Sequence, residues 1–446
     1  MEATTKQIIG PPLLKFFSKT SMFPAFHFHD LMREYGDVVK CGSFFYLINH
    51  PDVAKQILNR DQKDFNQEDF IGKRTQTVFG LGMVTSKGDM WANERRLLNP
   101  VLSSKTIHKH ISEANIEIDR VLDNWIPLTK SNKTFDIADK MGDMAIMTSG
   151  RLLFDTDFSS KIEEIKKVTI IGTKYIVDGI PFFIPYWIPT PGHLKLRKIS
   201  KKIDAIIDVI IQERANSDKN RDDLANALIS ALGGPNSTSQ DRRLMLDEMK
   251  TMLAGGYFPI ACSLSMFWHV IGENPSYLQK MKDEVRSKPI DYVFNECFYQ
   301  DFPVTSSAIF EAMRLYPVAF SIWRKAKIKC NIDGYIIPKG KTVCVSLFNV
   351  HRNPKFWNDP NKFMPERFNQ EESKNRPKHH FMPFGWGNRK CIGDHYAMMI
   401  IFLTVIKTLM RYDVEIIPAP KLVVKSAALM CPEKVEARIK LYDKEK

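Results

Sequence analysis

The sequence predicts a mainly α-helical protein with small β-sheets, and three observations lead to this prediction. From about residue 90 to residue 213, apolar residues recur at the three- and four-residue spacing of helices. A second helix is expected from Leu246 to Gly272. Its surface would be apolar nearly all round, which is typical of a buried central helix. Strand-like patterns occur in residues 35–54 and 323–345. We therefore expect helices to form most of the core.

Length and composition are those of a globular protein with a sizeable core. The chain has 446 residues, 44% hydrophobic and 26% charged, and no repeat or linker divides it, so we expect a single domain over residues 1–446. No run of about 18 apolar residues occurs, and residues 1–12 lack a leader pattern, which predicts no transmembrane segment. The seven cysteines are scattered, which favours a reducing compartment. We expect a cytoplasmic monomer.

The first half of the chain combines one short β region with many helices. Val38–Cys41 and Phe44–Ile48 predict a hairpin, and a helix is expected after Asn49-His50-Pro51. The proline-rich run over residues 180–191 interrupts the helical pattern, which resumes near His193. This apolar run is expected to line an access channel; a membrane-surface contact or simple packing are the alternatives.

The second half begins with a polar loop and returns to β structure after two helices. Residues 233–240 are polar and contain glycine, so we expect a loop before the long helix. A further helix ends at Pro317. Turns at Ile332–Tyr335 and Pro338–Lys341 then predict strands on either side.

The most specific local pattern surrounds Cys391. Nearby glycines let the backbone turn tightly and expose the sulfur, and the helix expected from about Ile392 would lower the thiol pKa with its positive end. Arg389 could pair with a carboxylate, and Phe384 could pack beside the sulfur. An isolated cysteine in a glycine turn is more often structural. The glycines of this loop are Gly385, Gly387 and Gly393.

The spacing Phe-x-x-Gly-x-Arg-x-Cys-x-Gly from Phe384 to Gly393 resembles the haem-binding signature of the cytochrome P450 superfamily. The resemblance implies the cytochrome P450 fold, with haem b between the long central helix and the cysteine-loop helix. It implies Cys391 as the axial thiolate ligand of the iron, and a monooxygenase activity.

Other motifs follow in the order of that family. Glu311-Ala-Met-Arg314 and Pro365-Glu-Arg-Phe368 match two of its segments and imply a polar triad. The triad would consist of Glu311, Arg314 and Arg367. Further matches imply contacts to the haem propionates, which need cations when desolvated. These contacts would come from Trp91, Arg95, Arg324 and Arg389.

The central helix departs from the family pattern at its oxygen-activating segment. Gly255 and Gly256 match the small pair, but Phe258 and Pro259 stand where an acid and a threonine are usual, and a one-residue shift does not restore them. Pro259 has no N–H, so the Gly255 carbonyl loses its helical partner and a kink is expected. Three oxidant routes stay open: dioxygen with protons from water or substrate, which leads; hydrogen peroxide; and isomerisation of a substrate peroxide.

The resemblance also predicts an apolar substrate pocket and an electron donor. The pocket residues imply a small hydrophobic organic substrate. They are Phe79, Phe182, Tyr257, Val318, Phe320 and Leu429. The net charge of +13 is spread along the chain, which argues against nucleic acid. Together with Lys390 it suits an acidic ferredoxin, flavodoxin or reductase; on charge alone, a solvated basic surface without a partner is the alternative. The competing class is a non-catalytic haem sensor.

Overall fold

The chain folds into two compact units, each assembled from two separate segments. The sheet unit comprises Met1–Gly72 and Phe310–Cys391, and the helical unit comprises Lys73–Ile309 and Ile392–Lys446. The computed structural model describes residues 6–12, 15–16, 23–67, 69–131, 133–177, 188–215, 223–232, 238–289, 292–419, 421–424 and 429–442. The single domain over residues 1–446 stays a prediction.

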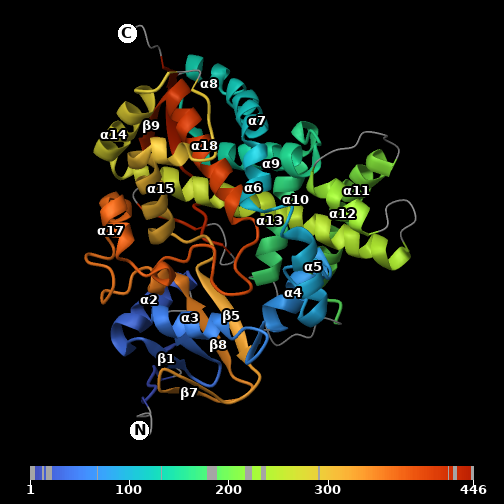
Figure 1. Cartoon of the computed structure of the whole chain (residues 1–446), viewed down its shortest axis with the longest axis vertical. Helices are drawn as coiled ribbons and strands as arrows, with labels where there is room; N and C mark the ends of the chain where they lie inside the picture. The colour runs from blue at the N-terminus through green and yellow to red at the C-terminus, as the bar shows by residue number, and fades with distance from the viewer. Residues whose placement is uncertain are drawn as a thin grey trace. The chain divides into compact units, whose positions relative to one another are not determined.

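The sheet unit is built on a five-stranded sheet in the order β1-β2-β8-β5-β3. Its first two strands form the predicted antiparallel hairpin, and β2 pairs in parallel with β8, so segments about 300 residues apart in sequence lie side by side (Figure 1). The strands are β1 (Val38–Cys41), β2 (Phe45–Ile48), β3 (Phe65–Gln67), β5 (Ser321–Ala326) and β8 (Thr342–Ser346). A separate hairpin joins β6 (Cys330–Ile332) to β7 (Tyr335–Ile337).

Short helices cover this sheet. Helix α3 (Pro51–Asn59) begins as predicted, with proline in its first turn and the His50 ring accepting a hydrogen bond from the Asp52 amide. Its apolar face joins the core of the sheet unit. The other helices are α2 (Pro24–Tyr35), α16 (Leu347–Val350), η4 (Pro365–Phe368), α17 (Gln370–Lys374) and η5 (Lys378–His380), and α15 (Pro303–Leu315) enters this unit at Phe310.

The helical unit is organised around the long helix α13 (Ser239–Gly272), which packs along α9 (Ile137–Phe154) (Figure 1). The other helices are α4 (Asp69–Phe79), α5 (Gly88–Leu98), α6 (Ser104–Lys109), α7 (Ile111–Asp123), α8 (Ile126–Ser131), α10 (Ile162–Val177), α11 (Pro191–Ala215), α12 (Leu224–Ala231), α14 (Pro275–Arg286) and α18 (Asp394–Arg411). A three-stranded sheet has the order β4 (Phe135–Asp136), β10 (Glu436–Leu441), β9 (Tyr412–Ile417). The predicted class, mainly α with small sheets, is confirmed. Within the part of the chain described, no helix has the length and apolar character of a bilayer span.

The start of α13 differs from the prediction. The helix begins at Ser239, seven residues before Leu246, because a capping box closes its first turn. The Thr238 hydroxyl accepts from the Asp241 amide at 3.1 Å, and the Asp241 carboxylate accepts from the Thr238 amide at 3.1 Å. The last two residues of the predicted loop, residues 233–240, therefore belong to the first turn of α13.

The expectation that this helix is apolar nearly all round is wrong for its first half. Asp247, Glu248 and Lys250 are buried there. The Lys250 ammonium lies 2.8 Å from Asp204 and 3.0 Å from Asp247. Asp247 also accepts a hydrogen bond from the Leu81 amide at 2.9 Å. Burial here depends on paired charges as well as on apolar contacts.

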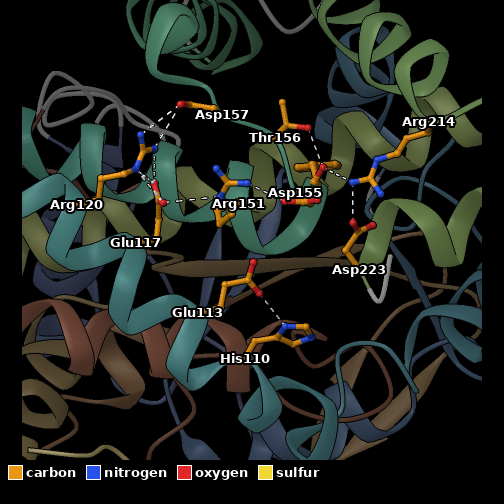
Figure 2. Close-up of polar contacts among 11 residues, drawn as sticks. His110, Glu113, Glu117, Arg120, Arg151, Asp155, Thr156, Asp157, Arg214 and Asp223 are labelled. Atoms are coloured by element: carbon orange, nitrogen blue, oxygen red, sulfur yellow. Dashed lines mark hydrogen bonds and ion pairs between the residues drawn. The ribbon is translucent and has the colours of Figure 1, made fainter. Parts of the chain in front are cut away.

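Ion pairs fix the helices around α9, as Figure 2 shows. Glu117 of α7, which is buried, accepts from Arg120 at 2.7 Å and lies 3.9 Å from Arg151 of α9. At the end of α11, Arg214 pairs with Asp223 at 2.6 Å, the residue that caps α12. These pairs join α7 to α9 and α11 to the start of α12.

Candidate functional site

The Cys391 loop is a tight turn that presents its sulfur at the surface of the chain. The Cys391 amide donates to the Phe384 carbonyl at 2.9 Å, and the Lys390 amide donates to the Gly387 carbonyl at 3.1 Å. Cys391 and Cys297 are the exposed cysteines among seven. An exposed thiol held by backbone hydrogen bonds is arranged to bind a ligand rather than to fill a core.

Gly387 is required at its position for two reasons. Its φ of +76° is costly for other residues, and a Cβ there would lie 2.3 Å from the Leu58 carbonyl oxygen. The loop is therefore packed directly against the end of α3. Phe384 is half-buried, and a Cβ on Gly393 would meet no atom within 4 Å.

Two arginines of the sheet unit share one buried carboxylate. Nη2 of Arg324 lies 2.9 Å from Oδ2 of Asp61, and Nε of Arg389 lies 3.8 Å from the same oxygen. All three side chains are at least nine-tenths buried, and Nε of Arg324 has no hydrogen-bond partner among the described residues. The Nε atom of Arg324 is therefore a spare donor in this cluster, which fits a further carboxylate such as a haem propionate.

The other two predicted propionate contacts lie on α5 of the helical unit. Trp91 is buried and Arg95 is half-buried. Because they are four residues apart in one helix, they share a face, with the indole and guanidinium donors on the same side.

Glu311, Arg314 and Arg367 lie together, in the arrangement that the resemblance implies. Both oxygens of Glu311 accept from Arg314, at 2.7 Å and 2.8 Å, and Nε of Arg367 lies 3.4 Å from Glu311. The Met364 amide also donates to this carboxylate at 2.9 Å. The Glu311 and Arg314 side chains are fully buried, so each depends on the other for its charge.

This triad extends toward the cysteine loop through His351. Arg314 donates to the His351 carbonyl at 2.8 Å, and the His351 ring accepts from the Met382 amide at 2.9 Å. Burial, with Arg314 and Arg352 nearby, lowers the pKa of His351 to about 3. The neutral ring thus supports the backbone at the start of the Cys391 loop.

Helix α13 has one uncovered stretch in an otherwise buried half. Between Met245 and Gly272 every residue is buried except Ala254, Gly255, Gly256, Phe258, Pro259 and Ser263. Gly255, Phe258 and Pro259 are three and four positions apart and so lie on one face. This face carries neither an acid nor an alcohol at the positions where the family pattern has them.

The two glycines of α13 have different surroundings. A Cβ on Gly255 would meet no atom within 4 Å, whereas a Cβ on Gly256 would lie 2.6 Å from Leu153 of α9. Gly255 therefore adds no side chain to the uncovered face, and Gly256 allows α13 to approach α9 closely.

The predicted substrate-pocket residues are scattered in their burial. Phe79, Val318 and Leu429 are half-buried, and Phe182 lies outside the described residues. Phe320 is buried, with its ring centroid 5.0 Å from that of Phe23. Tyr257 is also buried and donates to the Ile165 carbonyl at 3.4 Å, beside a cavity of about 10 Å³, the size of one water. Phe320 and Tyr257 have the surroundings of core residues.

A buried acid pair between α5 and α13 was not predicted. Glu94 of α5 accepts from the Ser86 hydroxyl, and Glu248 of α13 lies beside it. Burial, together with the charges of Glu94 and Asp247, raises the pKa of Glu248 to about 8. Sequence reasoning missed this pair because the sequence does not show that Glu94 of α5 packs beside Glu248 of α13. The sequence likewise gives no sign of Asp61.

Comparisons with known proteins agree with this geometry. The family model for cytochrome P450 matches residues 11–436. The cyclooctat-9-en-7-ol 5-monooxygenase of Streptomyces melanosporofaciens is 26% identical, covering 87% of this chain and 84% of the relative. Pentalenene oxygenase of Streptomyces avermitilis is 25% identical, covering 88% and 87%. Human cytochrome P450 4X1 is 25% identical, covering 87% and 80%.

Fold similarity points the same way. The crystal structure of a cytochrome P450, CYP102L1, superposes with a TM-score of 0.85 at 20% identity, covering 99% of this chain and 100% of the other. The chain belongs to the cytochrome P450 family, oxidoreductases that carry haem iron on a cysteine thiolate.

Proposed function

We propose that Cys391 is the thiolate ligand of the haem iron and that the chain inserts one oxygen atom from dioxygen into a small hydrophobic substrate. The observation that supports this most strongly is the loop itself, because backbone hydrogen bonds hold it in a turn in which Cys391 is exposed. Arg324, in the same unit, has a buried Nε donor without a partner among the described residues, which an anionic cofactor can use.

Each residue then has a defined task. The bound haem supplies the iron at which dioxygen is activated. Arg324 and Arg389 bind one set of cofactor carboxylate oxygens, and Trp91 and Arg95 donate to others. Glu311 and Arg314 hold the segment that positions the Cys391 loop. Gly255 leaves room on α13 for the cofactor and its substrate.

Proton supply is the point on which this chain departs from its family. Glu248 holds a proton at neutral pH, but it precedes Gly255 by seven residues, which is about 10 Å along the helix axis. That distance exceeds one hydrogen bond, so Glu248 does not replace the missing acid directly. We propose that water or the substrate donates the protons at the uncovered face, with one water held by the Gly255 carbonyl that Pro259 leaves unpaired.

Turnover with two oxidants tests this proposal against its alternatives. Product formation with an electron donor and dioxygen supports the monooxygenase. Product formed only with hydrogen peroxide indicates a peroxygenase, and conversion of a substrate hydroperoxide alone indicates an isomerase. Haem binding without turnover under any condition indicates a sensor.

The substrate and the electron donor are separable proposals. The compounds named in the relatives, cyclooctat-9-en-7-ol and pentalenene, are the first probes for a hydrophobic pocket, with the ferric spin-state shift as the readout. The charge of +13 supports an acidic electron-transfer partner, so electron transfer should slow as salt is raised. The scattered cysteines support a cytoplasmic location, and we propose a monomer.

A further inference from the structure

We propose that Asp52, His379 and His380 form a binding site for a divalent transition-metal ion of the zinc class. Within the described part of the chain, they are the one group of three ligand-type side chains close enough to hold an ion, with ligand atoms within 4.8 Å of one another. Nε2 of His379 lies 2.5 Å from Oδ1 of Asp52. All three residues belong to the sheet unit, and none of them has a role in the proposed haem chemistry.

The donor set suits zinc chemically. Two imidazole nitrogens and one carboxylate oxygen are ligands that zinc and its neighbours prefer, with a fourth position left for water. Zinc bonds of about 2.0 Å in a tetrahedron place ligand atoms about 3.3 Å apart. Asp52 and His379 would therefore separate by about 1 Å, and His380 would move in by at most about 1.5 Å.

The surroundings leave Asp52 free to adjust and hold the two histidine rings in place. The Asp52 side chain is 49% exposed, so it can rotate and an ion can enter there. Both histidines are 8% exposed, and the His380 ring packs against Phe356 at a centroid distance of 4.5 Å. Packed rings have few rotamers, so two of the three ligands are ordered in advance.

The backbone on each side of the site is also fixed. Asp52 lies in the first turn of α3, where its amide donates to the His50 ring at 3.2 Å. His379 and His380 form η5, which packs directly on α3. An ion would cross-link these two elements.

Such a cross-link would reach the cysteine loop. The ring of Trp386, in that loop, lies 6.0 Å from the ring of His379, and the end of α3 touches Gly387. A bound ion should therefore stabilise the segment that leads to Cys391, whatever the oxidant of the enzyme is.

Zinc titration of the haem-loaded, full-length protein tests this proposal. The protein is made without a histidine tag, stripped with EDTA and titrated with zinc chloride by calorimetry. We expect one ion per chain and a Tm rise of about 3 °C at a zinc concentration 100 times Kd. Asp52→Asn keeps the size and one acceptor oxygen but removes the charge, and it should weaken binding at least about tenfold, as should His380→Ala.

His110→Ala is the matched control. His110 lies 3.2 Å from Glu113 and has the same ligand types, but only two of them, so its loss should leave zinc binding unchanged (Figure 2). If His380→Ala loses its haem or fails to fold, Asp52→Asn decides alone, because its side chain is half exposed. No stoichiometric zinc uptake by the wild type, or equal uptake by the wild type and Asp52→Asn, overturns the proposal.

Discussion

Replacing Glu248 by glutamine should stabilise the protein in alkaline solution. Burial and neighbouring carboxylates raise the pKa of Glu248 from 4.5 to about 8. The unfolded chain loses this proton above pH 4.5, whereas the folded chain keeps it until about pH 8. The free energy of unfolding is therefore not reduced by this group below pH 4.5, and it falls as the pH rises from 4.5 to about 8. Glutamine is neutral throughout and avoids that loss.

The size of the effect follows from the shift. Each pKa unit corresponds to about 1.4 kcal/mol, so the shift from 4.5 to about 8 gives at most about 5 kcal/mol above pH 8. In a chain of 446 residues, 1 kcal/mol changes Tm by about 1 °C. Glu248→Gln should thus raise Tm by up to about 5 °C at pH 8.5 and leave it unchanged at pH 4.5.

Thermal unfolding at fixed scan rate between pH 4.5 and pH 8.5 measures this difference. Glu117→Gln is the control of opposite sign, because Glu117 is equally buried but lies against Arg120 and Arg151, so its neutralisation should lower Tm at neutral pH (Figure 2). A Glu248→Gln variant whose Tm matches or falls below the wild type at pH 8.5 refutes the reasoning.

Three further predictions concern the triad, the neighbouring His351 and helix α13. Glu311→Ala leaves the buried Arg314 and the partly buried Arg367 without their anion, so it should cost about 3–5 kcal/mol and lower the bound haem measured by absorbance. Glu415→Ala, which removes an exposed partner of Arg438, should cost under about 1 kcal/mol; equal losses would contradict this. His351, with a folded pKa of about 3, should make Tm fall as the pH drops below 6.5, and His351→Asn should flatten that acid decline; an unchanged decline counts against it. Phe258→Asp with Pro259→Thr should raise the fraction of reducing equivalents recovered as product if protons limit turnover, and an unchanged fraction would point to a proton borne by the substrate.

Local sequence patterns predicted part of the secondary structure; strands β3, β4, β9 and β10 lie outside the two predicted β regions. The hairpin of β1 and β2 and the turn between β6 and β7 follow from alternation and turn residues, and both are confirmed. The start of α13 was missed although its signal, Thr238 three residues before Asp241, is present in the sequence. A polar, glycine-containing stretch outweighed that signal.

The candidate site shows where such reasoning ends. Cys391, Glu311 and Arg314 stand in dense local motifs. Asp61 is more than 260 residues from Arg324 in the sequence, and only tertiary packing brings them together. Glu248 was missed for a similar reason, since burial of an acid depends on what packs against it and not on its neighbours in sequence.

The carbon-monoxide spectrum of the reduced protein tests the central claim most directly. The wild type should show the red-shifted Soret band that gives the family its name, because Cys391 would supply a thiolate ligand to the iron. Cys297→Ser, which removes the other exposed cysteine, should keep that band, and Cys391→Ala should lose it. A Cys391→Ala protein that retains the band, or a wild type that binds no haem, would contradict the account.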